Sequence, residues 1–274
     1  MNWYKRLNRA WRSYLVKKKN NSEYYLPAIQ SFANNYKKRL KFIEYHLKRE
    51  DYIFGTWKAI LIPKKDGEER PLIIPNSIND KIVLKAISDY LSDILASKFK
   101  SVQSISFAYQ KGKSTRDALI RLKEIHNQDN ILLKLDIKHF FDEIDKGILM
   151  RLVEKLSMNG YVKKLIKSGI TPNVDYSKLE KIDIDKFPKG GIPQGNPISS
   201  VLSNLYLYEL DKLAISKRWK MVRYADDMVF SVSNIEEAQL ILAQVEKYLL
   251  DYRKLVIHPL KNTSDAKTAI FLNP

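Results

Sequence analysis

The stretch Val222-Arg223-Tyr224-Ala225-Asp226-Asp227-Met228-Val229-Phe230 places two adjacent carboxylates between two short runs of residues that favour β-strands. Val222 and Tyr224 alternate with Arg223 before the acids, and apolar residues resume after them, which predicts a hairpin with a short turn. Two carboxylates at one tip repel each other unless water or a cation screens them. Aspartate is also common in ordinary turns, so this stretch alone leaves both a metal-binding tip and a plain turn open.

A third acid ends another predicted strand. Residues 131–136 form a short, almost wholly apolar run that closes on Asp136, as expected for a central strand. If this strand and the hairpin are neighbours, Asp136, Asp226 and Asp227 meet at one edge of a sheet. Three carboxylates suit a divalent ion, since Mg²⁺ prefers oxygen ligands. Such a cluster fits a reaction in which two metal ions clamp an in-line phosphoryl transfer to an attacking hydroxyl.

Two further segments could serve a nucleotide. Residues 58–63 and 68–75 predict a β-hairpin, on which Lys64 and Arg70 could hold a triphosphate. The glycine-rich run 190–195 would let the backbone approach a nucleotide closely. Asn196 and Pro197 then begin a helix, as N-cap and first-turn proline.

The chain is strongly basic. Its 274 residues contain 48 Lys and Arg against 31 Asp and Glu, a net charge of +17, and residues 1–50 hold 13 basic against 3 acidic residues. This balance favours a polyanionic partner, nucleic acid before membrane. The absence of cysteine excludes a disulfide scaffold and a thiolate metal site. No apolar run reaches about 18 residues, so we expect a cytoplasmic protein without a membrane anchor.

The remaining pattern predicts an α+β protein with helices behind a sheet. Residues 1–50 predict basic helices, the second over 36–49, whose Trp3, Tyr4, Trp11 and Tyr14 either pack inward or stack on bases. Residues 168–189 look irregular, and Ser233 to Glu236 predict a capping box. The other predicted helices span 79–99, 115–127, about 143–156, 196–213 and 233–252, and the last strands 256–261 and 269–272.

Taken in order, these motifs resemble a reverse transcriptase. Tyr224-Ala225-Asp226-Asp227 matches the catalytic tetrad of that family, and Leu135 to Phe141 is similar to its first metal-binding motif. Residues 191–200 resemble its nucleotide-side loop and helix, 62–72 its fingers hairpin, and 107–114 a bacterial-type fingers motif. The resemblance implies a right-hand polymerase fold with fingers and palm, and an RNA-directed DNA polymerase that uses dNTPs and Mg²⁺, with Mn²⁺ as an alternative.

The resemblance also implies roles for single residues. Asp136, Asp226 and Asp227 would be catalytic and, with Ile137, form the metal site. Phe141 would lie under the sugar and exclude a 2′-hydroxyl, while neighbouring Phe140 fits a core position better. The further expected nucleotide contacts are Lys64, Arg70, Gln194, Gly195 and Lys261, the last either a donor to pyrophosphate or a solvated lysine. The expected nucleic-acid contacts are Tyr109, Lys111, Lys113, Lys17, Lys18 and Lys19.

Three segments follow from this resemblance: a basic N-terminal extension over 1–50, fingers over 51–130 and palm over 131–274. The chain stops where a primer-grip motif begins, so we expect no thumb, with a protein partner or a second copy in its place. The expected partners are an RNA template, with a dedicated non-coding RNA as one form of it, a DNA primer or product, and dNTPs. The motif pattern is closest to defence-associated and abortive-infection enzymes, with retron and group II intron enzymes as relatives. Two alternatives stay open: a template-independent or protein-primed DNA polymerase, and an inactive nucleic-acid-binding scaffold.

Overall fold

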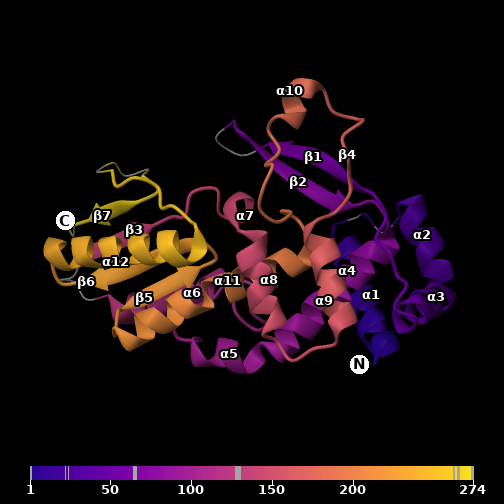
Figure 1. Cartoon of the computed structure of the whole chain (residues 1–274), viewed down its shortest axis with the longest axis horizontal. Coiled ribbons are helices and arrows are strands. Elements are labelled where there is room, and N and C mark those ends of the chain that lie inside the picture. The colour runs from indigo at the N-terminus through magenta and orange to yellow at the C-terminus, as the bar shows by residue number, and fades with distance from the viewer. Residues whose placement is uncertain are drawn as a thin grey trace. The chain divides into compact units, whose positions relative to one another are not determined.

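The computed structural model describes residues 2–21, 23, 25–63, 67–126, 131–261, 263 and 266–272. By spatial contact the chain forms two compact units (Figure 1). Unit 1 comprises Met1–Ile94, Leu156–Pro188 and Pro193–Ser199, and unit 2 comprises Leu95–Lys155, Lys189–Ile192 and Ser200–Pro274. The functional segments expected from the sequence, with boundaries after 50 and 130, stay a prediction.

Unit 1 combines a helical cluster with a small sheet. Helix α1 packs against α3 and α4, and α4 also contacts α9 and strand β2. The sheet has the order β2-β1-β4, in which β1 and β2 form the predicted hairpin and β4 is parallel to β1. Its elements are α1 (Trp3–Asn20), α2 (Pro27–Asn34), α3 (Tyr36–Lys48), β1 (Trp57–Pro63), β2 (Glu69–Pro75), α4 (Ile78–Ile94), α9 (Gly160–Ile170), β4 (Val174–Asp175) and α10 (Lys181–Ile184).

The aromatic residues of α1 belong to the core of unit 1. Trp3 and Trp11 are 6% and 2% exposed, and the Trp11 ring lies 4.6 Å from that of Phe32 on α2. The suggestion that these tryptophans stack on bases is therefore wrong, because both are buried, Trp11 against Phe32 of α2. The solvent face of α3 instead exposes Phe42 and Tyr45, at 58% and 55%, among lysines.

Unit 2 is built on an antiparallel sheet with the order β5-β6-β3-β7. Strand β3 lies between β6 and β7, as its apolar sequence predicts, and helix α12 packs along β6 and β3 (Figure 1). Helix α11 begins with its first turn in unit 1 and continues in unit 2. The elements are α5 (Ala96–Ser101), α6 (Thr115–Ile125), β3 (Ile131–Leu135), α7 (Phe140–Glu143), α8 (Lys146–Glu154), α11 (Pro197–Ser216), β5 (Met221–Tyr224), β6 (Asp227–Val232), α12 (Ile235–Arg253) and β7 (Ala269–Phe271).

Several predicted elements need correction. The helix expected over 79–99 breaks at Leu95. The one expected over about 143–156 is the shorter α8, which starts at Lys146 because Asp145 caps it by accepting a hydrogen bond from the Ile148 amide, and α7 precedes it as a separate turn. Residues 256–261 form single bridges rather than a strand. Asn234, not Ser233, caps α12. Helix α9 begins before the segment that looked irregular and was not predicted.

Within the described part of the chain, no helix is long and apolar enough to span a membrane.

Candidate active site

The site is built on the hairpin of β5 and β6 in unit 2. Tyr224 pairs with Asp227, so Ala225 and Asp226 make a two-residue turn. Ala225 has a φ of 60°, the left-handed backbone that such tight hairpins often require at their first turn position. The predicted turn is confirmed, and it presents Asp226 at its tip.

Strand β3 brings the third acid to the same edge. Its last residue, Leu135, pairs with Met228 of β6, so Asp136 comes level with Asp227. The pKa of Asp226 is raised from its ordinary value of 3.8 to about 6, mainly by burial and to a smaller extent by the charges of Asp136 and Asp227. Partial burial and Asp136 also raise the pKa of Asp227. Electrostatically the three carboxylates form one cluster, in which a proton or a cation is favoured.

The Asp136 carboxylate already has a cationic neighbour. The Lys267 ammonium lies 3.5 Å from Asp136 Oδ2, while the His258 ring Nε2, at 3.8 Å, is beyond hydrogen-bond distance. The backbone around Asp136 is fixed, because its carbonyl accepts a hydrogen bond from the His258 amide at 2.9 Å. Buried Ile137 follows, 2% exposed and bridged to Ile257.

The donor set fits a hard divalent cation, because it consists of carboxylates at one sheet edge, and the pKa values of Asp226 and Asp227 are raised there. Within the described ranges, however, no three His, Cys, Asp or Glu side chains form a ready-made metal site. The carboxylate side chains would have to turn toward one another for all three to share an ion.

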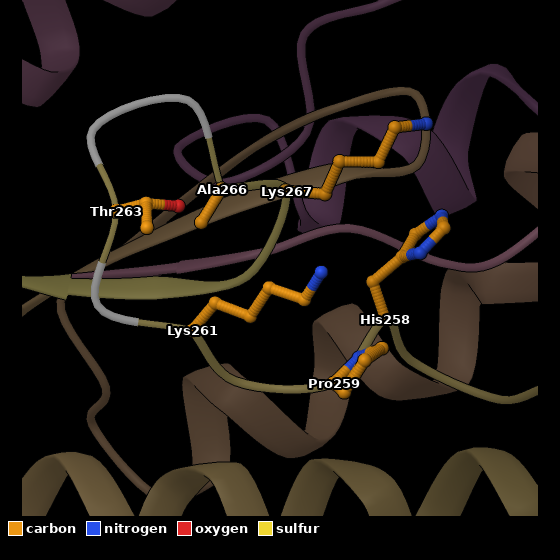
Figure 2. Close-up of a pocket in the computed structure, with 6 residues that line it drawn as sticks. All are labelled: His258, Pro259, Lys261, Thr263, Ala266 and Lys267. Carbon is orange, nitrogen blue, oxygen red and sulfur yellow. The ribbon is translucent and has the colours of Figure 1, made fainter.

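A basic pocket adjoins Asp136. It has a volume of about 220 Å³ and is lined by His258, Pro259, Lys261, Thr263, Ala266 and Lys267. Figure 2 shows Lys261 and Lys267 both extending their ammonium groups toward the side on which His258 lies. Lys261 is exposed, and its amide donates a hydrogen bond to the Thr268 carbonyl at 3.0 Å. The sequence indicated Lys261, whereas Lys267 and His258 were missed.

Phe141 is held by the glycine-rich run. The Ile192 amide donates a hydrogen bond to the Phe141 carbonyl at 2.8 Å, and Gly191 has a φ of 64°. A Cβ on Gly191 would lie 2.1 Å from the Phe141 carbonyl oxygen, so only glycine fits. Gly191 thus permits the close approach of residues 141 and 142. That the run 190–195 also lies close to a nucleotide stays a prediction from the sequence. Phe141 itself is half-buried, and Phe140 is a core residue at 3% exposure, as expected.

The remaining expected nucleotide contacts lie in unit 1. Gly195, with a φ of 90°, packs near Ile74 and Leu72 of β2, and the Gln194 carbonyl accepts a hydrogen bond from the Ile73 amide at 3.3 Å. Arg70 is exposed on β2 opposite Ile62. Lys64 lies outside the described residues.

The expected nucleic-acid contacts differ in their surroundings. Tyr109 is 44% exposed with a φ of 57°, and Lys111 is exposed. Lys113 instead donates hydrogen bonds to the carbonyls of Gln103 and Ser106 and lies over the Phe107 ring, so it holds its own loop together. On α1, Lys17 and Lys19 are exposed, and Lys18 pairs with Glu23.

The sequence pattern described as "Reverse transcriptase (RNA-dependent DNA polymerase)" matches residues 62–270. The chain belongs to the reverse transcriptase family. It is 28% identical over 196 residues to the group II intron-encoded protein LtrA of Lactococcus lactis, an alignment that covers 70% of this chain and 31% of LtrA. It is 25% identical over 198 residues to the retron Ec83 reverse transcriptase of Escherichia coli, covering 72% of this chain and 59% of that protein. The chain thus spans less than a third of the length of LtrA.

Solved telomerase structures share the fold of this reverse transcriptase. One from Candida albicans, in complex with a TWJ fragment of telomeric RNA, superposes with a TM-score of 0.55 at 13% identity, covering 82% of this chain and 46% of that chain. An apo telomerase from Candida tropicalis, truncated from the C-terminal domain, gives a TM-score of 0.55 at 18% identity over 77% of this chain and 51% of that one. The predicted family and right-hand polymerase fold are confirmed. Members of this family depend on divalent metal ions.

Proposed function

We propose that this reverse transcriptase domain is an RNA-directed DNA polymerase that joins dNTPs with Mg²⁺, or Mn²⁺ as an alternative, at Asp136, Asp226 and Asp227. The observation that carries the proposal is the strand register. Leu135 pairs with Met228 and Tyr224 with Asp227, which gathers the three carboxylates of the family's motifs at one sheet edge.

The charge state of the cluster supports a role for these residues as metal ligands. Burial and two carboxylate neighbours make the ionised form of Asp226 costly, and a bound divalent cation removes that cost. When bound, two such ions would activate the attacking 3′-hydroxyl and neutralise the leaving pyrophosphate. Lys267 and Lys261 add positive charge beside Asp136, in a pocket suited to a phosphate group.

Phe141 would set the choice of sugar. Its backbone is fixed by the contact with Gly191 and Ile192, so its half-buried ring cannot withdraw easily from a 2′-hydroxyl. Gln194, Gly195, Arg70 and Lys64 stay expected nucleotide contacts on the strength of the family motifs.

The basic residues of unit 1 support RNA as the template. Exposed Lys17 and Lys19 on α1, and Phe42 and Tyr45 among the lysines of α3, offer phosphate contacts and aromatic faces for unpaired bases. The intron-encoded and retron names of the relatives favour a bacterial retroelement as the source. A role in anti-phage defence and a cytoplasmic location stay predictions from the sequence.

The test is incorporation of labelled dTTP on poly(rA) annealed to oligo(dT) with MgCl₂. We expect DNA synthesis by the wild type, none by folded Asp136→Ala and Asp226→Ala variants, and normal synthesis by an Asp251→Ala control, an exposed aspartate on α12. Circular dichroism would verify that each variant is folded.

Three outcomes would contradict the proposal. Equal incorporation without poly(rA) would indicate a template-independent polymerase. Label that stays on the protein after denaturation would indicate protein priming. RNA binding without incorporation under any metal would indicate an inactive scaffold.

A further inference from the structure

A buried arginine lies directly under the catalytic turn. Arg223 of β5 and Asp211 of α11 are each 1% exposed, and they form a two-pronged ion pair. Arg223 Nε lies 2.7 Å from Asp211 Oδ1, and Nη2 lies 2.5 Å from Oδ2. The sequence had suggested only that Arg223 alternates with apolar neighbours, so this partner was not foreseen.

The remaining donors of Arg223 are used as well. Nη2 donates to the Ser106 hydroxyl at 2.9 Å, and Nη1 donates to Asn204 Oδ1 at 3.1 Å and to the Ala225 carbonyl at 2.8 Å. A guanidinium has five N–H donors in a rigid planar fork, and all of them are satisfied here. The guanidinium is therefore fixed in one orientation.

The bond to Ala225 connects this network to the reaction. Its carbonyl belongs to the peptide unit that leads into Asp226. Ala225 has a φ of 60°, a strained conformation for a non-glycine residue that persists only where the surroundings hold it. Arg223 supplies that restraint from beneath the turn.

Stability alone does not account for the pair. Burying two charges costs about as much as their attraction returns, and apolar replacements of similar volume are often neutral or stabilising. What apolar side chains cannot supply is a donor aimed at the Ala225 carbonyl.

We propose that Arg223, oriented by Asp211, is a positioning residue that fixes the Ala225–Asp226 peptide and so aims the Asp226 carboxylate for metal binding. This inference rests on the proposed function. Arg223 acts through the turn, since its guanidinium donates to Asp211, Asn204, Ser106 and Ala225.

The network also includes the loop of the expected fingers motif. The Asn204 amide donates to the Ala108 carbonyl at 2.7 Å, and the backbone of residues 105–107 pairs with Arg223 on both sides. Residues 105–108 therefore help to hold Arg223 in place beneath the turn, together with Asp211 and Asn204 of α11.

The test compares three variants of the full chain. Arg223→Lys keeps a charge but loses the fork, Asp211→Asn keeps the shape but loses the charge, and the double variant Arg223→Met with Asp211→Leu replaces the pair by apolar groups. Val245→Ala, a buried residue of α12, serves as a destabilised control. For each, we would measure kcat per titrated active site, KM for dTTP, the Mg²⁺ concentration at half-maximal rate, and Mn²⁺ affinity by electron paramagnetic resonance.

We expect the double variant to fold, to lose at least tenfold in kcat and to need several times more Mg²⁺, with KM for dTTP little changed. Arg223→Lys should show the same split, and Val245→Ala should lose stability only. A folded double variant with normal kcat and normal metal dependence would overturn the inference.

The two proposals fail separately. A wild type that binds Mn²⁺ but does not polymerise refutes the proposed function. The Mn²⁺ affinities of the variants then test the positioning role of Arg223. Unchanged affinities overturn that role, and weakened affinities support it. A wild type that neither polymerises nor binds Mn²⁺ refutes both.

Discussion

Replacing Asp226 by asparagine should make the metal-free protein more stable while it abolishes catalysis. The native fold holds the Asp226 carboxyl where burial and two neighbouring acids raise its pKa from 3.8 to about 6. At neutral pH the folded protein must therefore carry an ionised group that it disfavours, whereas the unfolded chain carries the same group at no cost. Asparagine has a similar shape and no charge.

The magnitude follows from the two pKa values. A rise from 3.8 to about 6 corresponds to about 3 kcal/mol at pH 7.5. For a chain of 274 residues, this amounts to about 5 °C in Tm, from an unfolding entropy of about 2.1 cal/mol/K per residue. Because the pKa is raised in the folded state, the wild type is destabilised by Asp226 least below pH 3.8, where the carboxyl is protonated in both states. Its free energy of unfolding falls as the pH rises from 3.8 through about 6. The advantage of Asp226→Asn should therefore fall to about half at pH 5 and to about 0.5 kcal/mol at pH 4.

The assay is urea unfolding of both proteins in EDTA at pH 7.5, 5 and 4, followed by circular dichroism. Asp251→Asn on the surface of α12 is the matched control and should change the free energy of unfolding by less than about 0.5 kcal/mol. Mg²⁺ should then stabilise the wild type more than Asp226→Asn, because a ligand of the folded state adds to stability. The reasoning is refuted if Asp226→Asn is no more stable than the wild type at pH 7.5, or if its advantage does not shrink with falling pH.

Three further predictions concern other parts of the chain. Phe141→Ala should reduce discrimination of dNTPs against rNTPs by about 10- to 200-fold, measured as the ratio of kcat/KM values, and unchanged discrimination would exclude Phe141 as the gate. Gly191→Ala should cost several kcal/mol in urea unfolding, since its Cβ would lie 2.1 Å from the Phe141 carbonyl oxygen, and a wild-type midpoint would show that the loop yields freely. Replacing Lys17, Lys18 and Lys19 by glutamine should flatten the slope of log RNA affinity against log salt by about 2, and an unchanged slope in a folded variant would exclude this cluster as a phosphate contact.

The sequence predicted those parts of the site in which reactive residues lie within a local pattern that also predicts a strand, turn or helix. An apolar strand ending in Asp136 and a hairpin carrying Asp226 and Asp227 each follow from a few neighbouring residues, and pairing β3 with β6 was the natural way to join them. The helix starting at Pro197 was equally local, because asparagine and proline mark it. Such elements need no knowledge of the rest of the chain.

The sequence reading failed where a distant element decides which side of a residue is covered. Trp11 is buried against Phe32 of α2, a helix that was not predicted, and Trp3 is buried as well. The close contact of Gly191 with the Phe141 backbone, 50 residues earlier in the chain, was not foreseen either. The exposed face of α3 with Phe42 and Tyr45 was predictable from the sequence. Leu40 and Ile43, three residues apart, mark the buried face, and Phe42 and Tyr45, with the same spacing, fall on another face of the helix.

Arg223 shows why the support of a site is harder to predict than its acids. In an alternating strand a charged residue is usually assigned to the solvent face, but both faces of β5 are covered in this protein, and Arg223 is 1% exposed. Its partner Asp211 lies on α11 and its other acceptors on a loop and on the turn itself. The same hairpin thus carries two costs, the raised pKa of Asp226 and the left-handed backbone of Ala225. The acid cluster can be predicted from the residue types in its motifs, whereas the groups that hold it in place can be identified only from the three-dimensional structure.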